Sequence, residues 1–206
     1  NAAYDAIAYA VAAYEGSPEV NAFSSKFDLA SRNLAKLTAQ ERRGRALFGG
    51  KAKCGKCHID GGRDPLFTDY TFDNLGVPRN PENPIYAVRP DFVDLGLGAF
   101  LRAAGHPESV YEPEFGKQKV PTVRNVARAP HPGVVKAFTH NGYFKSLESL
   151  VHFYNTRDVK PVCPGDYTEA EALAAGCWPA PEVAANVNDA ELGNLGLKPD
   201  EEAAIV

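Results

Sequence analysis

The segment 53–58, KCGKCH, brings two cysteines and a histidine together within six residues. Cys54 and Cys57 have two residues between them, and His58 follows the second cysteine directly. This is the pattern of covalent haem attachment: the spacing lets two thiols add to the two haem vinyl groups, and the adjacent histidine supplies the proximal ligand of the iron. We therefore expect one covalent haem c, attached at Cys54 and Cys57 and ligated by His58.

Two other interpretations of the same cysteines have to be weighed. The pair could be a redox dithiol, or half of a four-cysteine zinc site completed by Cys163 and Cys177. The dithiol usually lies in a βαβ unit, of which the sequence gives no sign. Zinc sites usually use two closely spaced pairs, whereas thirteen residues separate Cys163 from Cys177. Haem attachment is therefore the leading interpretation.

Cys163 and Cys177 lie in a segment rich in turn-forming residues, VCPGDYTEAEALAAGCW. A disulfide closing a loop of this size would stabilise the fold by roughly 3 kcal/mol. Disulfides and covalent haem both belong to oxidising compartments outside the cytoplasm, so we expect a periplasmic protein whose signal peptide is removed or lies outside the chain. Two free buried thiols are the alternative.

The composition excludes several classes of partner. The formal net charge is −4, which gives no support to binding nucleic acid through its phosphates. No segment approaches the ~20 apolar residues that cross a bilayer, so we expect no membrane span. Lys51, Lys53 and Lys56 surround the cysteine pair and would form either a small basic rim for an acidic redox partner or an ordinary solvated surface.

The hydrophobic pattern shows no strand-alternating run and predicts an all-α fold with long loops. The predicted helices cover 2–15, 39–48, a short segment ending at Gly105, 146–155, 168–175, 189–195 and 199 onward. The loop from Gly61 to Arg89 is unusually long, which is typical of a segment that wraps a ligand. Its apolar side chains would bury against a flat cofactor; they are Phe67, Tyr70, Phe72 and Leu75.

The ligand on the other side of the iron cannot be methionine, because the chain contains none. The remaining candidates are Tyr154 and the histidines other than His58, namely His106, His131, His140 and His152. A histidine or tyrosine on an amphipathic helix is more often a packing residue than a ligand. Spacing alone does not choose among them.

Several blocks of sequence, in order along the chain, carry a family resemblance. They are ERRGRALFGGKAKCGKCH, LFTDYTFDNLGVP, VPTVRNVA, FTHNGYFKSLESLVHFYN and ELGNLGLKPDEEAAIV. Together they resemble the C-terminal haem domain of the bacterial di-haem cytochrome c peroxidase and MauG family. In that family the sixth ligand comes from the helix after an H-[DN]-G turn, as methionine in the peroxidases and tyrosine in the MauG branch. The resemblance therefore implies that Tyr154 ligates the iron opposite His58.

The resemblance also implies further residues around the haem. His140 would be a hydrogen-bonding group near the distal face or a domain junction, and Arg124 would contact a haem propionate or an interface, while a plain surface arginine is the alternative. The family often binds calcium between its two haem domains through backbone carbonyls, which correspond here to Val135 and Ala137. Because the remaining ligand comes from the other domain, we expect no calcium in this chain alone.

We interpret 1–206 as a single c-type haem domain. Its expected parts are a lead-in helix and linker (1–37), a haem core (38–159), an insertion (160–187) and truncated C-terminal helices (188–206). The resemblance implies the electron-transfer half of a di-haem peroxidase or MauG-like oxidase, with a second haem domain or subunit and a small redox protein as partners. The isolated chain would then not be a competent peroxidase, and no catalytic residue is assigned.

Two other functions stay open. Together with a second haem domain, a His58/Tyr154-ligated haem could oxidise a partner protein, as MauG-like enzymes do. An open iron site could instead sense or bind a small ligand.

Overall fold

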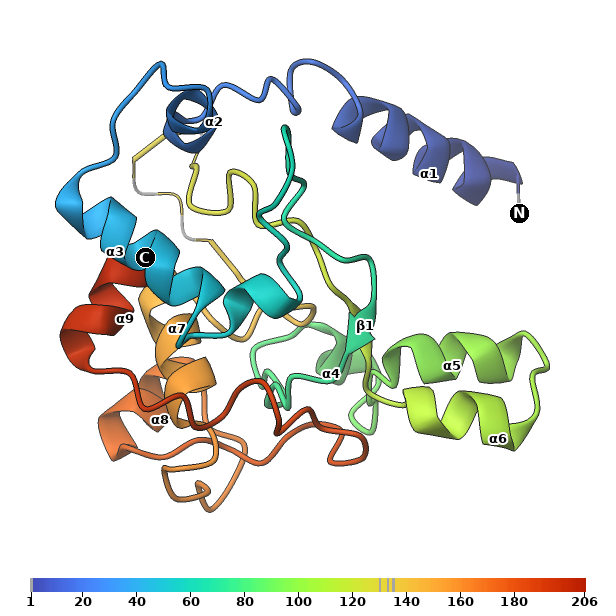
Figure 1. Ribbon diagram of the computed structural model, residues 1–206. Helices are drawn as coiled ribbons and strands as arrows, with labels where there is room; N and C mark the ends of the chain where they lie inside the picture. Colours follow the sequence, from blue (N-terminus) through green and yellow to red (C-terminus); the bar gives the residue numbers. More distant parts are fainter. Residues whose placement is uncertain (1, 130, 133, 135) are drawn as a thin grey trace. The chain divides into compact units, whose positions relative to one another are not determined.

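The structure is a computed structural model that describes residues 2–129, 131, 132, 134 and 136–206 (Figure 1). Helices make up 38% of the described residues and each strand has two residues, so the predicted all-α class is confirmed. The elements in chain order are α1 (Ala2–Glu15), α2 (Lys26–Ser31), α3 (Ala39–Gly49), the 3-10 turn η1 (Cys54–Lys56), β1 (Phe72–Asp73), α4 (Ile85–Val88), α5 (Gly96–Ala103), α6 (Glu108–Tyr111), the 3-10 turn η2 (Glu112–Glu114), β2 (Gln118–Lys119), α7 (Leu147–Thr156), α8 (Glu169–Ala175) and α9 (Pro199–Ile205).

Six of the seven predicted helices are confirmed, as α1, α3, α5, α7, α8 and α9. Their ends follow from local chemistry. The hydroxyl of Ser146 accepts a hydrogen bond from the backbone N–H of Ser149 over 3.1 Å and so caps α7. Pro199 occupies the first turn of α9, where its missing N–H costs nothing.

The described chain divides into two compact units, and the first comprises Asn1–Thr38 and Gly61–Asp64. It holds α1 and the short helix α2. The sequence predicted α1 but not α2. Ser25 caps α2 through a box with Asp28: the Ser25 hydroxyl accepts from the Asp28 N–H, and the Asp28 carboxylate accepts from the Ser25 N–H. No residue of α1 is buried, and Tyr4 on its apolar stripe is 73% exposed.

The second unit comprises Ala39–Asp60 and Pro65–Val206, and α9 packs there against both α3 and α7. Gly44 makes the close approach of α3 and α9 possible. A Cβ atom at this position would lie 1.9 Å from the carbonyl oxygen of Ala204, which is far inside van der Waals contact. The helices therefore meet backbone to backbone at Gly44.

The hydrophobic core of this unit is built around aromatic side chains. Phe144 and Phe153 are fully buried, and Trp178 stacks edge-on against Phe153 with 5.3 Å between ring centroids. Trp178 belongs to the segment 160–187, which is predicted to be an insertion. This segment contributes to the core, and its being an insertion stays a prediction.

Short backbone pairings tie the long loop after the cysteine motif to distant parts of the chain. β1 pairs antiparallel with β2, with Phe72 opposite Lys119. Single bridges join Asn74 to Val187 and Pro78 to Pro181. Because these partners come from the end of the 160–187 segment, that segment also fixes the loop.

The helix predicted for 189–195 is wrong, and α9 is the one helix of the 188–206 segment. The backbone there bonds to α7 instead of to itself: Gly193 N–H donates to the Tyr154 carbonyl over 2.6 Å, and Leu195 N–H donates to the Asn155 carbonyl over 3.3 Å. Gly193 has a φ of 97°, which a helix does not allow. Tertiary hydrogen bonds outweigh the local helical pattern.

Candidate haem site

The cysteine motif forms one tight turn directly after α3. Lys53 opens the turn with a φ of 57°, and the backbone N–H of His58 donates to the carbonyl of Cys54 over 2.9 Å. Cys54 and Cys57 are both half-buried and are not bonded to each other. The turn therefore presents two reduced thiols and an imidazole from five consecutive residues.

Both thiols are held in their protonated form. Burial raises the pKa of Cys54 to about 11. Burial, together with the carboxylates of Asp73 and Glu191, raises the pKa of Cys57 to about 12. Since the thiolate is the species that oxidises, a high pKa slows formation of a disulfide between the two cysteines.

The imidazole of His58 is oriented by a backbone carbonyl. Its Nδ1 atom lies 3.0 Å from the carbonyl oxygen of Phe67. A carbonyl can only accept, so Nδ1 carries the proton and Nε2 keeps a free lone pair. Metal-binding histidines are typically fixed in this way, through a hydrogen bond from the nitrogen that does not bind the metal. The ring also packs near Phe48, with 6.5 Å between ring centroids.

Tyr154 lies close to the same turn. Its side chain projects from α7, is half-buried, and packs against the hydrophobic core. Burial raises the pKa of its phenol, and the nearby thiols of Cys54 and Cys57 raise that pKa further. We find no hydrogen-bond partner for the hydroxyl among the described residues. A phenolate here would need a positive charge beside it, such as a ferric iron.

Comparison with known proteins decides the family. No protein-family model matches the chain. The chain is 32% identical, over 97% of its length, to methylamine utilization protein MauG of Paracoccus denitrificans (strain Pd 1222), and it covers 48% of that protein. It is 30% identical over 71% of its length to cytochrome-c peroxidase IdrP1 of Denitromonas iodatirespirans, of which it covers 39%. The diheme peroxidase BthA of Burkholderia thailandensis E264 matches 92% of the chain with a TM-score of 0.66 and 28% identity.

The chain belongs to the MauG and di-haem cytochrome c peroxidase family. It spans less than half the length of the curated relatives named above. It also covers 46% of the BthA chain. The family resemblance stated from the sequence is thereby confirmed.

In this member of the MauG and peroxidase family, Phe67 and Arg124 support the histidine. Phe67 has a φ of 53°, which turns its carbonyl toward His58. The guanidinium carbon of Arg124 lies 5.9 Å from the centre of the Phe67 ring, and its Nη1 donates to the carbonyl of Pro65 over 2.8 Å. Arg124 thus braces the backbone that orients His58, and its predicted contact with a haem propionate stays a prediction.

The structure places His140 in different surroundings. Its Nε2 lies 3.9 Å from Glu182, whose side chain is 4% exposed. Tyr86 donates its hydroxyl to the same carboxylate over 2.9 Å. Burial, and secondly Glu182, raises the pKa of Tyr86 to about 12. None of the described contacts of His140 involves the cysteine motif, so its predicted place near the haem stays a prediction.

The three other histidine candidates for the sixth ligand have different surroundings. His152 is held by Glu202 on α9, at 3.1 Å from Nδ1 to a carboxylate oxygen. His131 is exposed, and its Nδ1 lies 3.2 Å from the carbonyl of Pro132. His106 is also exposed. Among the described residues, Tyr154 is therefore the candidate whose side chain is near enough to both cysteine thiols for them to affect its pKa.

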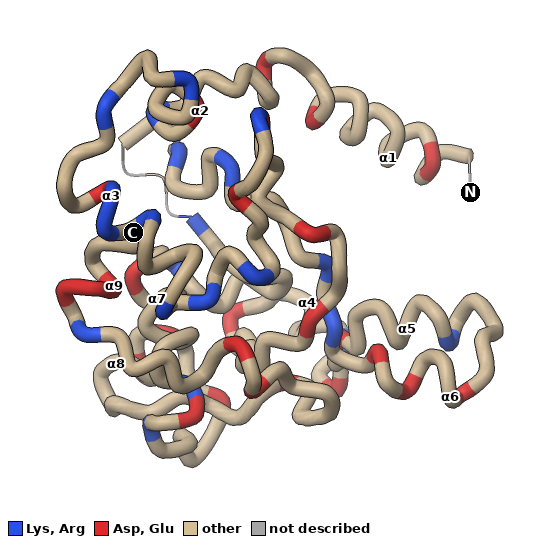
Figure 2. Tube along the Cα trace, viewed as in Figure 1, with Lys and Arg blue, Asp and Glu red and all other residues tan. Residues whose placement is uncertain are grey.

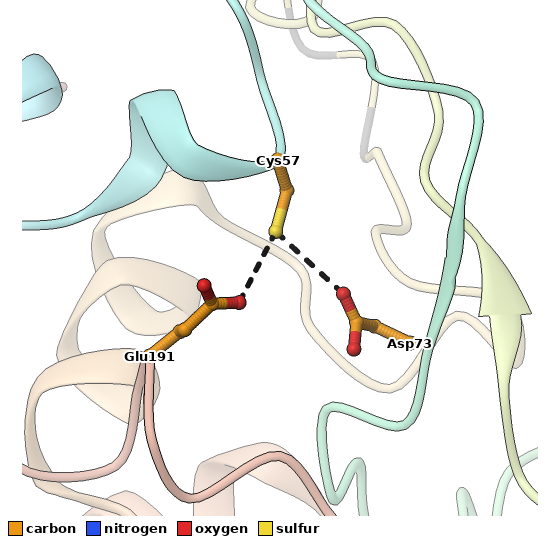
Figure 3. Close-up of side chains that lie close together, drawn as sticks. All are labelled: Cys57, Asp73 and Glu191. Carbon is orange, nitrogen blue, oxygen red and sulfur yellow. Dashed lines mark hydrogen bonds between the residues drawn. The ribbon is translucent and has the colours of Figure 1, made fainter.

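Sequence reasoning missed two acidic residues at the site. The Sγ atom of Cys57 lies 3.6 Å from a carboxylate oxygen of Asp73 and 3.6 Å from one of Glu191 (Figure 3). Asp73 comes from β1 and Glu191 from the segment before α9. Both lie in blocks that carry the family resemblance, LFTDYTFDNLGVP and ELGNLGLKPDEEAAIV, but the resemblance assigned neither a role. Their meeting at Cys57 depends on how these distant segments fold together.

The lysines around the motif are engaged within the chain. Lys51 pairs with Glu201 at 2.5 Å, and Lys53 donates to the carbonyl of Ala190 over 2.7 Å. Lys56 lies 3.7 Å from Glu191. Basic residues on α3 and the following turn thus face the acidic start of α9 and the segment before it (Figure 2). Lys51 and Lys56 nevertheless keep 41% and 60% of their side chains exposed, so the basic rim for a redox partner and the ordinary solvated surface both stay open.

Cys163 and Cys177 form a disulfide, with their Cα atoms 5.2 Å apart. Both residues are buried, and a backbone bridge between Val162 and Trp178 runs beside them. The disulfide therefore closes the segment whose tryptophan fills the core.

Two sequence-based expectations concern features beyond the cysteine motif. Of the backbone carbonyls that the family resemblance assigns to calcium, that of Ala137 is described, whereas Val135 lies outside the described residues. In the part of the chain that the structure describes, none of the helices has both the length and the hydrophobicity that crossing a bilayer requires.

Proposed function

We propose that this chain is a c-type haem domain, in which Cys54 and Cys57 hold the cofactor through thioether bonds and Nε2 of His58 ligates the iron. When bound, the haem supplies one-electron chemistry at the iron. One observation carries the proposal: the 3.0 Å contact from His58 Nδ1 to the Phe67 carbonyl leaves Nε2 as a free ligand atom beside two unpaired thiols. The residues present therefore suit a haem.

We further propose Tyr154 as the ligand on the opposite side. Its position near both cysteine thiols, and the absence of a hydrogen-bond partner for its hydroxyl among the described residues, support this role. A phenolate oxygen is a hard anionic donor that favours ferric iron, so the reduction potential should be low. In the rival arrangement the iron position is open and Tyr154 only packs nearby.

The function best supported is electron transfer within a di-haem enzyme. The domain would exchange electrons with a small redox protein and with a second haem domain or subunit. The relatives are named as cytochrome-c peroxidases and diheme peroxidases, whereas this chain has one Cys-x-x-Cys-His motif. We therefore expect residues 1–206 to form a single haem domain that is not a competent peroxidase when isolated.

A second function is favoured by the similarity to MauG, which extends over 97% of the chain. Together with a second haem domain, a His58/Tyr154-ligated site would oxidise a partner protein. In both functions this chain's residues bind and orient the cofactor. Both also fit a periplasmic location, which the Cys163–Cys177 disulfide supports.

Optical spectroscopy of two matched variants tests the proposal. The purified protein should show a low-spin ferric haem spectrum that cyanide does not change. Tyr154→Phe should open the iron position, so that cyanide binds rapidly. Tyr167→Phe, which removes the hydroxyl of another tyrosine packed against the core, should behave like the wild type.

Three results would count against the proposal. A colourless protein would refute haem binding. Rapid cyanide binding by the wild type would support an open site for small ligands instead of Tyr154 ligation. Peroxide turnover by the isolated chain would show that catalysis does not need a second haem domain.

A further inference from the structure

Asp73 and Glu191 converge on one sulfur atom from distant parts of the chain. Each places a carboxylate oxygen 3.6 Å from Cys57 Sγ, and the three ligand-type atoms lie within 4.8 Å of one another. In Figure 3 the sulfur points between the two carboxylates. Carboxylates this close repel each other, so the arrangement needs other groups to hold it.

Asn188 supplies the main support. Its Nδ2 donates to Asp73 Oδ1 over 3.2 Å and to Glu191 Oε2 over 2.9 Å, so that one amide bridges the two carboxylates. Its Oδ1 accepts from the backbone N–H of Glu191 over 3.1 Å, and its carbonyl accepts from Arg157 over 3.0 Å. The pair is therefore positioned by neutral donors that leave its negative charge in place.

The two carboxylates differ in how much of their negative charge a nearby cation neutralises. Lys56 lies 3.7 Å from Glu191 and partly neutralises it. Among the described residues, no lysine, arginine or histidine lies within 4.0 Å of the carboxylate of Asp73. Aspartate and glutamate are ordinarily ionised at neutral pH. Asp73 thus contributes the less compensated negative charge.

We propose that Asp73 and Glu191 lower the reduction potential of the haem attached at Cys57; this rests on the proposed function. Once Cys57 is a thioether it has no S–H to donate, and both carboxylates remain as acceptors at the covalent link. Reduction of ferric to ferrous iron adds one electron, breaks no bond and removes one positive charge. Nearby negative charge stabilises the ferric form more than the ferrous form, and net charge is a recognised determinant of haem potential.

Potentiometric titration of the haem-loaded protein tests this directly. Asp73→Asn should shift the one-electron equilibrium toward the ferrous form by about tenfold, which is an increase of about 59 mV. Glu191→Gln should shift it in the same direction by less, because Lys56 already offsets that charge. Lys56→Gln should shift it the opposite way.

The matched control is Glu108→Gln, which removes one negative charge from an exposed position on α6, in the helical pair that projects away from α3 and α7 (Figure 1). It should leave the potential unchanged. Equal potentials for Asp73→Asn and the control would overturn the inference, as would a Lys56→Gln shift of the same sign as the carboxylate variants.

Haem loading, measured by intact mass in every protein, separates this inference from the proposed function. A wild type without haem would refute the function itself. A loaded set of variants with unchanged potentials would refute only the role of the two carboxylates. If Asp73→Asn fails to fold, the opposite signs expected for Glu191→Gln and Lys56→Gln still decide the question.

Discussion

Asn155 shows how a single side chain on α7 positions the segment 188–198, which precedes α9, beside the site. Its Nδ2 donates to the carbonyl of Leu197 over 3.0 Å, and its Oδ1 accepts from the Leu197 N–H over 2.9 Å. The side chain imitates a backbone pairing between α7 and this segment. Because Tyr154 is the preceding residue, the same contact fixes the part of α7 that carries the proposed ligand.

Asn155→Ala should lower the free energy of unfolding by about 2 kcal/mol, because it leaves two buried backbone groups of Leu197 without partners. Chemical denaturation of the purified protein measures this. Asn194→Ala, at an exposed position of the same segment, should change stability by less than about 0.5 kcal/mol. Equal effects from the two variants would contradict the pairing role of Asn155.

At the residue scale, the sequence predicts those residues of the site that the chemistry requires at a fixed spacing along the chain. Cys54, Cys57 and His58 follow from the geometry of haem attachment, and Tyr154 follows from a family resemblance. Asp73, Asn188 and Glu191 could not be predicted, because their meeting depends on how β1 and the 188–198 segment fold onto the motif.

At the scale of helices, the contact between α3 and α9 depends on the absence of one side chain. Gly44 lies on α3 where the backbone of Ala204 on α9 approaches it, whereas Gly49 at the end of α3 has no atom within 4 Å of the position that a Cβ would take. Replacing either glycine with alanine adds the same methyl group, which would meet the backbone of α9 at Gly44 and open space at Gly49.

Gly44→Ala should destabilise the fold by about 1–3 kcal/mol, because the added methyl group forces α3 and α9 apart. Gly49→Ala should be neutral or stabilise by up to about 1 kcal/mol, because alanine favours the helix. Thermal or chemical denaturation of both variants measures these changes. A similar effect of the two substitutions would show that the helices do not meet at Gly44.

The sequence predicted correctly those helices that have a hydrophobic periodicity and also a residue that marks an end. Examples of such residues are Ser146, which caps α7, and Pro199 in the first turn of α9. The failures have physical reasons. The 189–195 segment has a helical pattern, but its backbone groups bond to α7. α2, α4 and α6 are six residues or shorter, so they carry too little periodicity to be recognised.

At the scale of the whole second unit, the 160–187 segment connects the core, the disulfide and the loop that carries Asp73. Trp178 from this segment is 2% exposed and donates its ring N–H to Thr156 on α7 over 3.0 Å. Cys163 and Cys177 are separated by 14 positions and close the segment into a loop. Loss of the disulfide should therefore destabilise the whole unit.

Replacing both cysteines, as C163S/C177S, should lower the free energy of unfolding by roughly 3 kcal/mol, the value expected for a loop of this length. Chemical denaturation gives the difference. A reductant added to the wild type should cause a similar loss and should not affect the double variant. A wild type that is insensitive to reductant would contradict this account of the segment.

The proposed function depends on one cofactor being joined covalently to this polypeptide at Cys54 and Cys57. Intact mass spectrometry under denaturing conditions measures this most directly, since only covalent groups survive. We predict the mass of the chain plus one haem, less the two hydrogens lost in forming the Cys163–Cys177 disulfide. A mass equal to that of the bare polypeptide would contradict the central claim.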